Sequence, residues 1–259
     1  MTGIVIAGTP ELSEPKFNFE QVAVLAKGLE RTLAARRVRV ALIGRLGLRP
    51  ELMPPGFRFS HAGFAVYSRI ETGDGRLLPG YAVYNLYGDM ARTSKSHLAQ
   101  DYPVDYLAIV QRLEVGVVIP NKKLQELLVN TINSGSYKLL HNPEYSVISN
   151  PMNIRYQNCT EFVLDVVMSA IYKTADKRVI KANLNAYFKP QRVIVDELKL
   201  TMATMTIPEV KVDDHQGPIA TTSFSGIARF LMENHIAEEA FVYIVDPDTL
   251  YARVEKLEI

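Results

Sequence analysis

The chain has 259 residues, of which 47% are hydrophobic and 22% charged, and its formal net charge is +1. This is an ordinary globular composition; the near-neutral charge argues against nucleic-acid binding, and no apolar run reaches the roughly 20 residues of a membrane span. We expect a single domain over residues 1–259, with a core at about 18–175 and a C-terminal elaboration at about 176–259.

The chain contains a single cysteine. This excludes an intrachain disulfide framework and a zinc site built from several cysteines, and we expect no metal and no cofactor. The stretch Asp213-Asp214-His215 combines metal-ligand residue types, but its glycine- and proline-containing surroundings favour a solvated turn. Residues 1–17 indicate an irregular lead-in; their apolar patch lacks a preceding basic region, so we expect no intact signal peptide.

The first predicted element is a helix that begins after Asn18 and runs to about Arg37, with apolar residues spaced along one face. Arginines gather at its C-terminal end, at positions 36, 37 and 39. Cations suit the negative end of a helix dipole, which explains this cluster without nucleic acid. A strand is expected at 38–43 and a proline-rich loop at 50–56.

A hairpin is predicted next. Residues 57–70 alternate and are rich in aromatics, 73–75 supply turn residues, and 80–87 form the second strand. His61 falls in the first strand and Asn85 in the second, so we expect their side chains to face the same side of neighbouring strands. A strand histidine can also be no more than a packed, hydrogen-bonded residue, and that alternative stays open.

The stretch from Gly88 to Asp105 is polar and lacks clear periodicity. It is interpreted as a long loop, serving either as a lid or as a plain surface excursion. The elements expected after it are a strand at 115–119, a helix capped by Asn121, a short strand at 145–149 and a loop at 150–157.

Cys159 then opens a helix. Apolar residues at 162, 163, 166, 167 and 170 follow the spacing of an amphipathic helix, with Asn158 or Cys159 itself at the N-cap. Unpaired backbone N–H groups and the positive end of the dipole favour a thiolate there, so the sequence predicts a lowered pKa for Cys159. The alternative is that Cys159 is an inert, buried, small hydrophobic residue.

The rest of the chain carries less chemistry. We expect helices at 177–188 and after Ser223 or Ser225, and strands at 192–195 and 240–245. The sequence contains no Walker A motif, no Rossmann glycine fingerprint and no Gly-x-Ser-x-Gly nucleophile elbow.

Three motifs in this order resemble the circularly permuted NlpC-like branch of the papain-like cysteine hydrolase superfamily, which includes the lecithin:retinol acyltransferase-like proteins. They are Ser60-His61-Ala62-Gly63-Phe64, Val83-Tyr84-Asn85-Leu86 and Asn158-Cys159-Thr160-Glu161-Phe162-Val163. The motifs lie within about residues 57–170, and the whole chain resembles an uncharacterised bacterial family known as a domain of unknown function. The resemblance implies an α+β fold in which an antiparallel sheet packs against the central cysteine-bearing helix.

The resemblance implies a cysteine-dependent hydrolase or acyltransferase that acts on an amide, peptide or ester bond through an acyl-enzyme. Cys159 would be the nucleophile, His61 the base, and Asn85 the residue that orients the imidazole. The substrate would be a small molecule, a lipid or a peptide. The alternative is a non-catalytic ligand- or peptide-binding protein that uses the same groove.

Further residues are candidates for the oxyanion hole or the pocket: Tyr145, Asn158 and Tyr156, with the backbone N–H of Cys159 as an oxyanion donor. Tyr145 stands close to where NlpC-type enzymes place a tyrosine, and Tyr156 is its rival. We expect residues 88–105 and 150–156 to border the groove. The sequence leaves the oligomeric state open, and the compartment open between bacterial cell envelope and cytoplasm.

Overall fold

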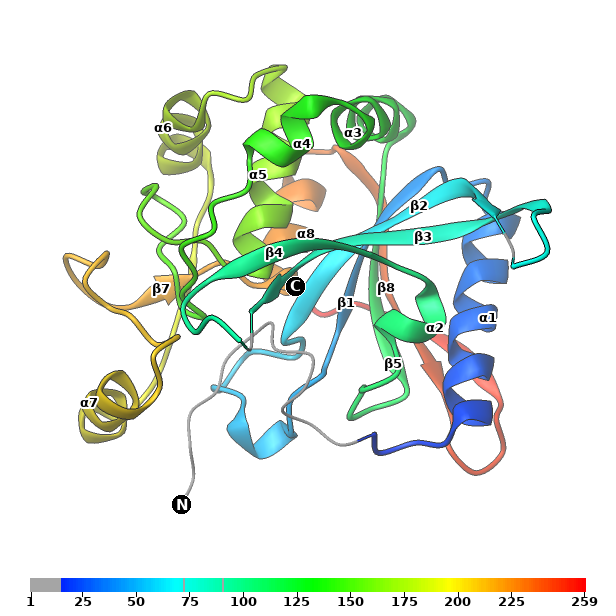
Figure 1. The fold of residues 1–259 in the computed structure, drawn as a ribbon, viewed down its shortest axis with the longest axis horizontal. Helices are drawn as coiled ribbons and strands as arrows, with labels where there is room; N and C mark the ends of the chain where they lie inside the picture. The colour runs from blue at the N-terminus through cyan, green and yellow to red at the C-terminus, as the bar shows by residue number, and fades with distance from the viewer. Residues whose placement is uncertain (1–14, 72, 90) are drawn as a thin grey trace.

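The computed structural model describes residues 15–71, 73–89 and 91–259 (Figure 1). It is built on an antiparallel sheet of seven strands in the order β4-β3-β2-β1-β5-β8-β9, which confirms the predicted α+β fold class. These strands are β1 Val40–Arg45, β2 His61–Glu71, β3 Leu77–Gly88, β4 Ser96–Asp101, β5 Glu114–Pro120, β8 Ala237–Val245 and β9 Ala252–Lys256. The prediction for residues 1–17 falls almost entirely outside the described residues.

Helices cover both faces of this sheet (Figure 1). They are α1 Phe19–Ala35, α2 Pro103–Tyr106, α3 Lys122–Asn133, α4 Gly135–Leu139, α5 Cys159–Tyr172, α6 Lys177–Tyr187, α7 Glu197–Thr206 and α8 Phe224–Glu233, with a short 3₁₀ turn at Pro50–Leu52. Helices α1 and α2 pack on one face, and α3, α5 and α8 on the other. The two-residue strands β6, Gln191–Arg192, and β7, Ala220–Thr221, pair apart from the main sheet.

Strand alternation divides the core between these faces. Along β2, Ala62 and Phe64 belong to the core under α5, whereas Ala65 belongs to the core under α1. This is the period of two that a strand imposes on its side chains. His61 and Gly63 therefore share the face of α1 and α2.

Helix α5 is the centre of the larger core. Its residues from Cys159 to Ala170 are all buried, and it packs against the sheet, α3 and α6. Asn158 is its N-cap and accepts a hydrogen bond from the backbone N–H of Glu161 (2.8 Å). Each large apolar side chain buried here contributes about 1.5–3 kcal/mol, which holds the start of the helix against β2.

Two glycines allow α8 to approach the sheet closely. Gly44 of β1 lies opposite Gly116 of β5. A Cβ at Gly44 or Gly116 would lie 2.8 or 2.6 Å from ring atoms of Phe224, at the start of α8. Side chains at these positions would therefore push α8 away from the sheet.

The structure corrects several predicted elements. The predicted loop at 88–105 contains β4 and α2, and Tyr145 forms an isolated bridge with Gln157 instead of opening a strand. The strand expected at 192–195 is reduced to the β6 pair. Helix α7 and strand β9 were not predicted, because both are largely exposed and present no continuous apolar face to read.

Candidate functional site

His61 and Asn85 meet as expected. Gly63 of β2 pairs with Asn85 of β3, and His61 Nε2 lies 3.0 Å from Asn85 Oδ1. The amide Nδ2 of Asn85 donates to Asp101 Oδ2 of β4 (2.9 Å), which fixes the orientation of the amide. Because Oδ1 can only accept, Nε2 carries the imidazole proton, and Nδ1 is the basic nitrogen.

The imidazole is also held by aromatic rings. The ring of Tyr87 stacks on His61, with centroids 4.9 Å apart and planes 7° apart, and the tilted ring of Tyr106 of α2 lies 5.5 Å away. The Tyr87 hydroxyl donates to Asp101 Oδ2 (2.7 Å). Asp101 thus anchors both the orienting amide and the stacked ring.

Cys159 lies beside the backbone of the same strand. Its Sγ is 3.9 Å from the carbonyl oxygen of Ser60, and the backbone N–H of Ala62 is directed at the sulfur. These two residues flank His61, at the end of β2 where its pairing with β3 has stopped. The start of helix α5 therefore places the thiol beside the backbone of β2 at the position of His61.

The thiol and the imidazole are not hydrogen-bonded in this structure. The thiol points toward Ser60, and His61 Nδ1 is buried without a hydrogen-bond partner among the described residues. The His61 ring shares a face with Tyr106 of α2, whereas α5 packs on the opposite face. The predicted contact between the sulfur and the ring nitrogen stays a prediction.

Burial controls the protonation of both groups. It raises the pKa of the Cys159 thiol from 9.0 to about 11, against opposing effects from the N–H groups of Ala62 and Thr160 and from the charge of Arg45. Burial, followed by Arg45, lowers the pKa of His61 well below its usual value. The predicted lowering of the thiol pKa is therefore wrong: the helix-start amides act in the expected direction, but desolvation outweighs them.

Arg45 is a residue that the sequence analysis missed. It ends β1, lies opposite His61 in the register, and is 2% exposed. Its Nε and Nη1 have no hydrogen-bond partner within the described part of the chain. The guanidinium carbon lies 4.8 Å from the ring centroid of Tyr106 and 6.0 Å from that of Tyr87. The available signal was an arginine at the end of an otherwise apolar strand.

Asn158 is occupied by structural hydrogen bonds. Its Oδ1 accepts from the Glu161 N–H, and its Nδ2 donates to the carbonyl of Val147 and to Thr221 Oγ1, each at 3.1 Å. Both ends of the amide are engaged, so in this structure the Asn158 side chain positions α5. Its assignment as an oxyanion or pocket residue stays a prediction.

The two candidate tyrosines are placed differently. Tyr145 is fully buried, and its pKa is raised well above the usual value by burial and then by the proximity of Cys159. The Tyr156 hydroxyl lies 3.3 Å from Asp213 and also accepts from Arg155. Tyr145 therefore lies near the thiol, whereas the Tyr156 hydroxyl contacts Arg155 of the same loop and Asp213 of the 213–215 stretch.

The 213–215 stretch forms a turn with Asp213 exposed, as predicted, but it is only partly solvated. Asp214 is buried and accepts from the backbone N–H of Asn150 (2.8 Å). Its carbonyl accepts from the side chains of Asn150 and Asn153. This stretch therefore fixes the loop before α5.

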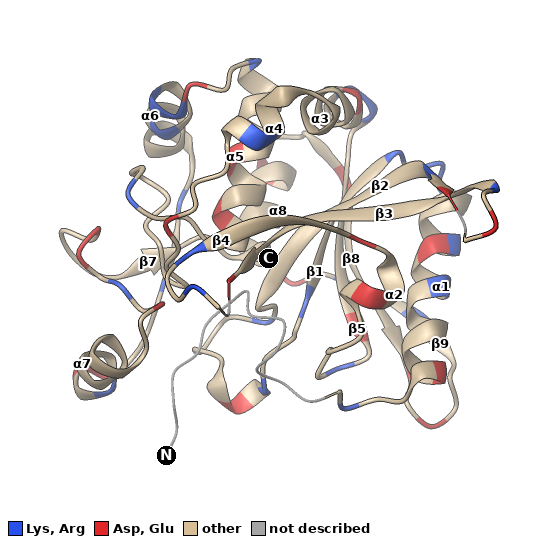
Figure 2. Cartoon of the chain, viewed as in Figure 1, with Lys and Arg blue, Asp and Glu red and all other residues tan. Residues whose placement is uncertain are grey.

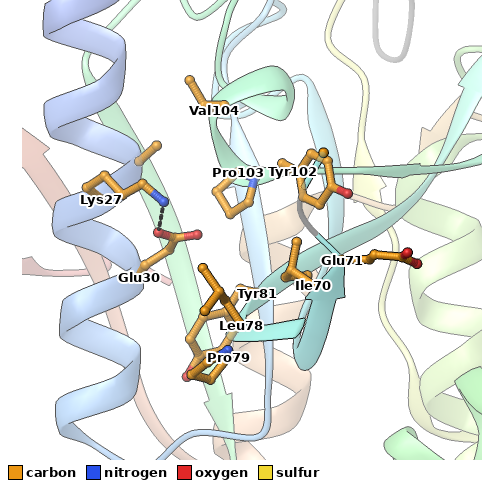
Figure 3. A pocket seen from close by; sticks show the side chains of 12 residues that line it. Lys27, Glu30, Ile70, Glu71, Leu78, Pro79, Tyr81, Tyr102, Pro103 and Val104 are labelled. Carbon is orange, nitrogen blue, oxygen red and sulfur yellow. Dashed lines mark hydrogen bonds and ion pairs between the residues drawn. The ribbon is translucent and has the colours of Figure 1, made fainter. Parts of the chain in front are cut away.

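A separate hollow of about 530 Å³ lies between α1, the β2–β3 hairpin and the start of α2 (Figure 3). Its walls include Leu78, Tyr81 and Tyr102, and the ion pair between Lys27 and Glu30 (2.7 Å) lies at its edge. None of the predicted site residues lines it. Part of the predicted 88–105 loop thus borders this hollow through Tyr102 and Pro103.

The surface charges are mixed. Figure 2 shows basic and acidic residues interspersed over the helices and the hairpin. Even the arginine-rich end of α1 faces Glu238 and Glu239, and Arg36 pairs with Glu239 (3.2 Å). Within the described residues, no helix is both long and apolar enough to cross a membrane.

Comparison with known proteins gives one match. A family model described as an uncharacterized protein conserved in bacteria (DUF2145) matches residues 32–231, a span that includes His61, Asn85 and Cys159. No curated protein and no solved structure matches the chain.

Proposed function

The chain belongs to this family of uncharacterised bacterial proteins, and we propose that it is a papain-like cysteine hydrolase or acyltransferase of the NlpC-like type. The reaction is acyl transfer from an amide, peptide or ester through an acyl-enzyme on Cys159. His61 is the base, Asn85 orients it, and Asp101 supports Asn85.

One observation carries this proposal. His61 uses its Nε2 proton in the hydrogen bond to Asn85, and its basic Nδ1 has no partner among the described residues. The two strand residues beside His61 contact the Cys159 sulfur. A packed histidine usually satisfies both ring nitrogens when it is buried. Nucleophilic catalysis needs a base with an available lone pair, and the position of His61 between the two residues that contact the sulfur makes its Nδ1 the candidate.

At rest the thiol–imidazole pair is uncharged, because burial favours the thiol and the neutral imidazole. His61 Nδ1 takes the thiol proton as the sulfur bonds to the acyl carbon, and gives that proton to the leaving amine or alkoxide. Water or another acceptor then loses a proton to Nδ1 and attacks the thioester, which releases Cys159 as the thiol. N–H groups in the first turn of α5 stabilise the oxyanion.

Asp101 compensates for the neutral orienting residue. An amide positions the imidazole but carries no charge to stabilise imidazolium. The Asp101 carboxylate accepts from Asn85 Nδ2 and places a negative charge one residue further along the same hydrogen-bonded chain. The His61–Asn85–Asp101 series therefore supports a transient positive charge on His61.

Acylation by p-nitrophenyl esters of varied chain length, followed by intact and peptide mass analysis, tests the proposal. Because Cys159 is the only cysteine in the chain, a thioester is assigned without ambiguity. We expect acylation of the native protein to be faster than that of the urea-unfolded chain at neutral pH, and to be absent in Cys159→Ser. If the native protein is acylated more slowly than the unfolded chain, the proposed enzymatic activity is contradicted.

A non-catalytic binding protein is the second candidate. The observation that favours it is the complete burial of Cys159 with its raised pKa, which is how an inert thiol behaves. Iodoacetamide separates the two: a buried structural thiol reacts more slowly in the native protein than in urea at every pH from 6 to 9. A nucleophile paired with His61 reacts faster in the native protein.

A further inference from the structure

Arg45 is a buried cation for which the described part of the chain provides no ion partner. Its side chain is 2% exposed, and Nε and Nη1 have no hydrogen-bond partner among the described residues. The rings of Tyr106 and Tyr87 lie near the guanidinium, and the Tyr87 hydroxyl interacts with it. Ring contacts offset only part of the cost of burying a charge, which normally requires an ion partner or full hydrogen bonding.

Neighbouring carboxylates are already engaged elsewhere. Asp101 accepts from Asn85 and from the hydroxyl of Tyr87, which stands between Asp101 and the guanidinium. Glu114, at the start of β5, pairs with Arg58 (2.8 Å). The described part of the chain thus supplies the ring contacts and the phenol but no ion partner for Arg45.

Arg45 lies within the site. It is opposite His61 in the β1–β2 register, and its charge acts on both Cys159 and His61. An anion bound to Arg45 would therefore lie close to the thiol and the base. Because the Arg45 side chain is buried here and does not lie at the surface, the anion that pairs with it has to belong to a molecule that enters the site.

We infer that Arg45 binds a carboxylate of the acyl substrate, close to the bond that is cleaved; this inference rests on the proposed function. The substrate class is then an amide, peptide or ester with a carboxylate near its scissile carbonyl. Arg45 is the group that selects it, because an arginine forms directional, charge-assisted hydrogen bonds with carboxylates. Binding of the carboxylate also supplies the ion partner that the described residues do not give Arg45.

The first experiment compares alkylation of Cys159 by iodoacetate and iodoacetamide, which share an electrophile and differ in the carboxylate. The ratio of the two rates cancels the thiolate fraction, so a change in the thiol pKa does not affect it. We expect the native protein to favour iodoacetate, relative to the unfolded chain, by roughly tenfold or more, the effect of one charge-assisted hydrogen bond. Arg45→Gln should lose this preference, and Arg45→Lys should keep part of it.

Arg69→Gln is the matched control, since Arg69 lies on the far, exposed part of β2 and should leave the ratio unchanged. A native ratio equal to that of the unfolded chain, or a preference that survives Arg45→Gln, overturns the inference. The native-to-unfolded comparison needs no variant, so a failure of Arg45→Gln to fold does not remove the test.

The second experiment needs no reactive thiol. Thermal unfolding of Cys159→Ser is measured with N-acetylglycine, with N-acetylglycinamide, which replaces the carboxylate by an amide, and with inorganic phosphate at equal ionic strength. We expect N-acetylglycine alone to raise the Tm, and Arg45→Met in the same background to abolish the rise. Equal or greater stabilisation by phosphate overturns the assignment to a carboxylate.

The Tm of Arg45→Met without added ligand provides a third test. Removing a partnerless buried charge should leave the Tm unchanged or raise it, whereas an Arg45 that serves the fold would lower the Tm on replacement, and that result contradicts the inference. The proposed function can fail independently of this inference. If Cys159 is not acylated but N-acetylglycine still stabilises the protein through Arg45, the protein binds carboxylates and is not the proposed enzyme.

Discussion

Two groups of buried polar side chains lie in neighbouring parts of the core and differ in how completely their hydrogen bonds are satisfied. The α5–α6 cluster consists of Glu161, Asp165 and Lys181 with their partners Ser149 and Gln157. The sheet-end cluster consists of Arg45, His61, Tyr87, Asn85 and Asp101.

In the α5–α6 cluster each charged group has a partner within the chain. Lys181 Nζ donates to Glu161 Oε1 and Asp165 Oδ1, both at 2.7 Å. Gln157 Nε2 donates to Asp165 Oδ2 (2.8 Å), and Ser149 Oγ donates to Glu161 Oε2 (2.5 Å). The cluster joins α6 and the loop before Cys159 to the first two turns of α5.

The sheet-end cluster is incomplete. Asn85 and Asp101 are bonded, but His61 Nδ1 and two nitrogens of Arg45 are buried without partners in the described structure. Unsatisfied buried polar groups cost stability and are tolerated where they meet a ligand. Charge and burial are common to both clusters, so they do not distinguish a site from a structural cluster. The buried groups whose hydrogen bonds are unsatisfied do.

The largest expected effect tests the unpartnered nitrogen of His61. Replacing His61 by Gln removes the base, and acylation of Cys159 should slow by about 10²–10⁴-fold, the usual contribution of general acid–base catalysis. Mass-resolved acylation rates measure it. His235→Gln is the control, because His235 is an exposed histidine at the end of α8. Equal rates in the two variants would show that His61 is only a packed residue.

The second-largest expected effect comes from disrupting the α5–α6 cluster. Lys181→Met leaves the Asp165 carboxylate buried without its cation and removes a hydrogen-bond donor to Glu161, and the free energy of unfolding should fall by about 3–5 kcal/mol. Urea unfolding followed by circular dichroism measures it. Lys189→Met, at an exposed position after α6, should change stability by no more than about 0.5 kcal/mol. Similar values for the two variants would contradict a structural role of this cluster.

A finer test compares the two carboxyls of that cluster. Asp165 accepts from Lys181 with both oxygens and from Gln157, so Asp165→Asn turns an amide N–H toward a donor. Glu161→Gln replaces a carboxyl whose pKa is raised by burial, and its amide can donate to Ser149. We expect Asp165→Asn to cost about 1–3 kcal/mol and Glu161→Gln less, by urea unfolding at pH 7. The reverse order would be evidence against this assignment of donors and acceptors.

Asp101→Asn tests the charge behind Asn85. The amide oxygen of an asparagine can still accept from Asn85 and Tyr87, so the geometry should persist while the negative charge is lost. We expect acylation to slow by roughly tenfold. The attraction between the Asp101 carboxylate and the His61 imidazolium, with Asn85 between them, is worth about one to two kcal/mol at an effective dielectric constant near 20. The Tm should stay near that of the native chain; a large fall in Tm with an unchanged rate would instead make Asp101 a structural residue.

The last prediction concerns the dependence of stability on pH. Burial raises the pKa of Glu161 from 4.5 to about 8, so over this interval the folded chain holds a proton that the unfolded chain has released. Stability from this group is present in full below pH 4.5 and declines as the pH rises toward 8. In Glu161→Gln the curve of unfolding free energy against pH should be flatter over that range. A variant curve as steep as that of the native chain would assign the slope to other groups.

The sequence by itself determined the local elements and part of the site. Asn18, Asn121 and Asn158 cap their helices as predicted, because a cap depends on residues within one turn. The hairpin brought His61 and Asn85 onto neighbouring strands, because a strand's alternation and a short turn fix which residues share a face. The family-like order of histidine, asparagine and cysteine was also readable from the chain.

Tertiary structure alone decided which groups complete the site and how they ionise. Asp101 reaches Asn85 only because β4 pairs with β3, and Arg45 reaches His61 only because β1 pairs with β2. The raised pKa of Cys159 reverses the prediction made from its helix position, because desolvation depends on everything packed around the sulfur. Caps and periodicity act over a few residues, whereas strand pairing and burial join residues far apart in the chain.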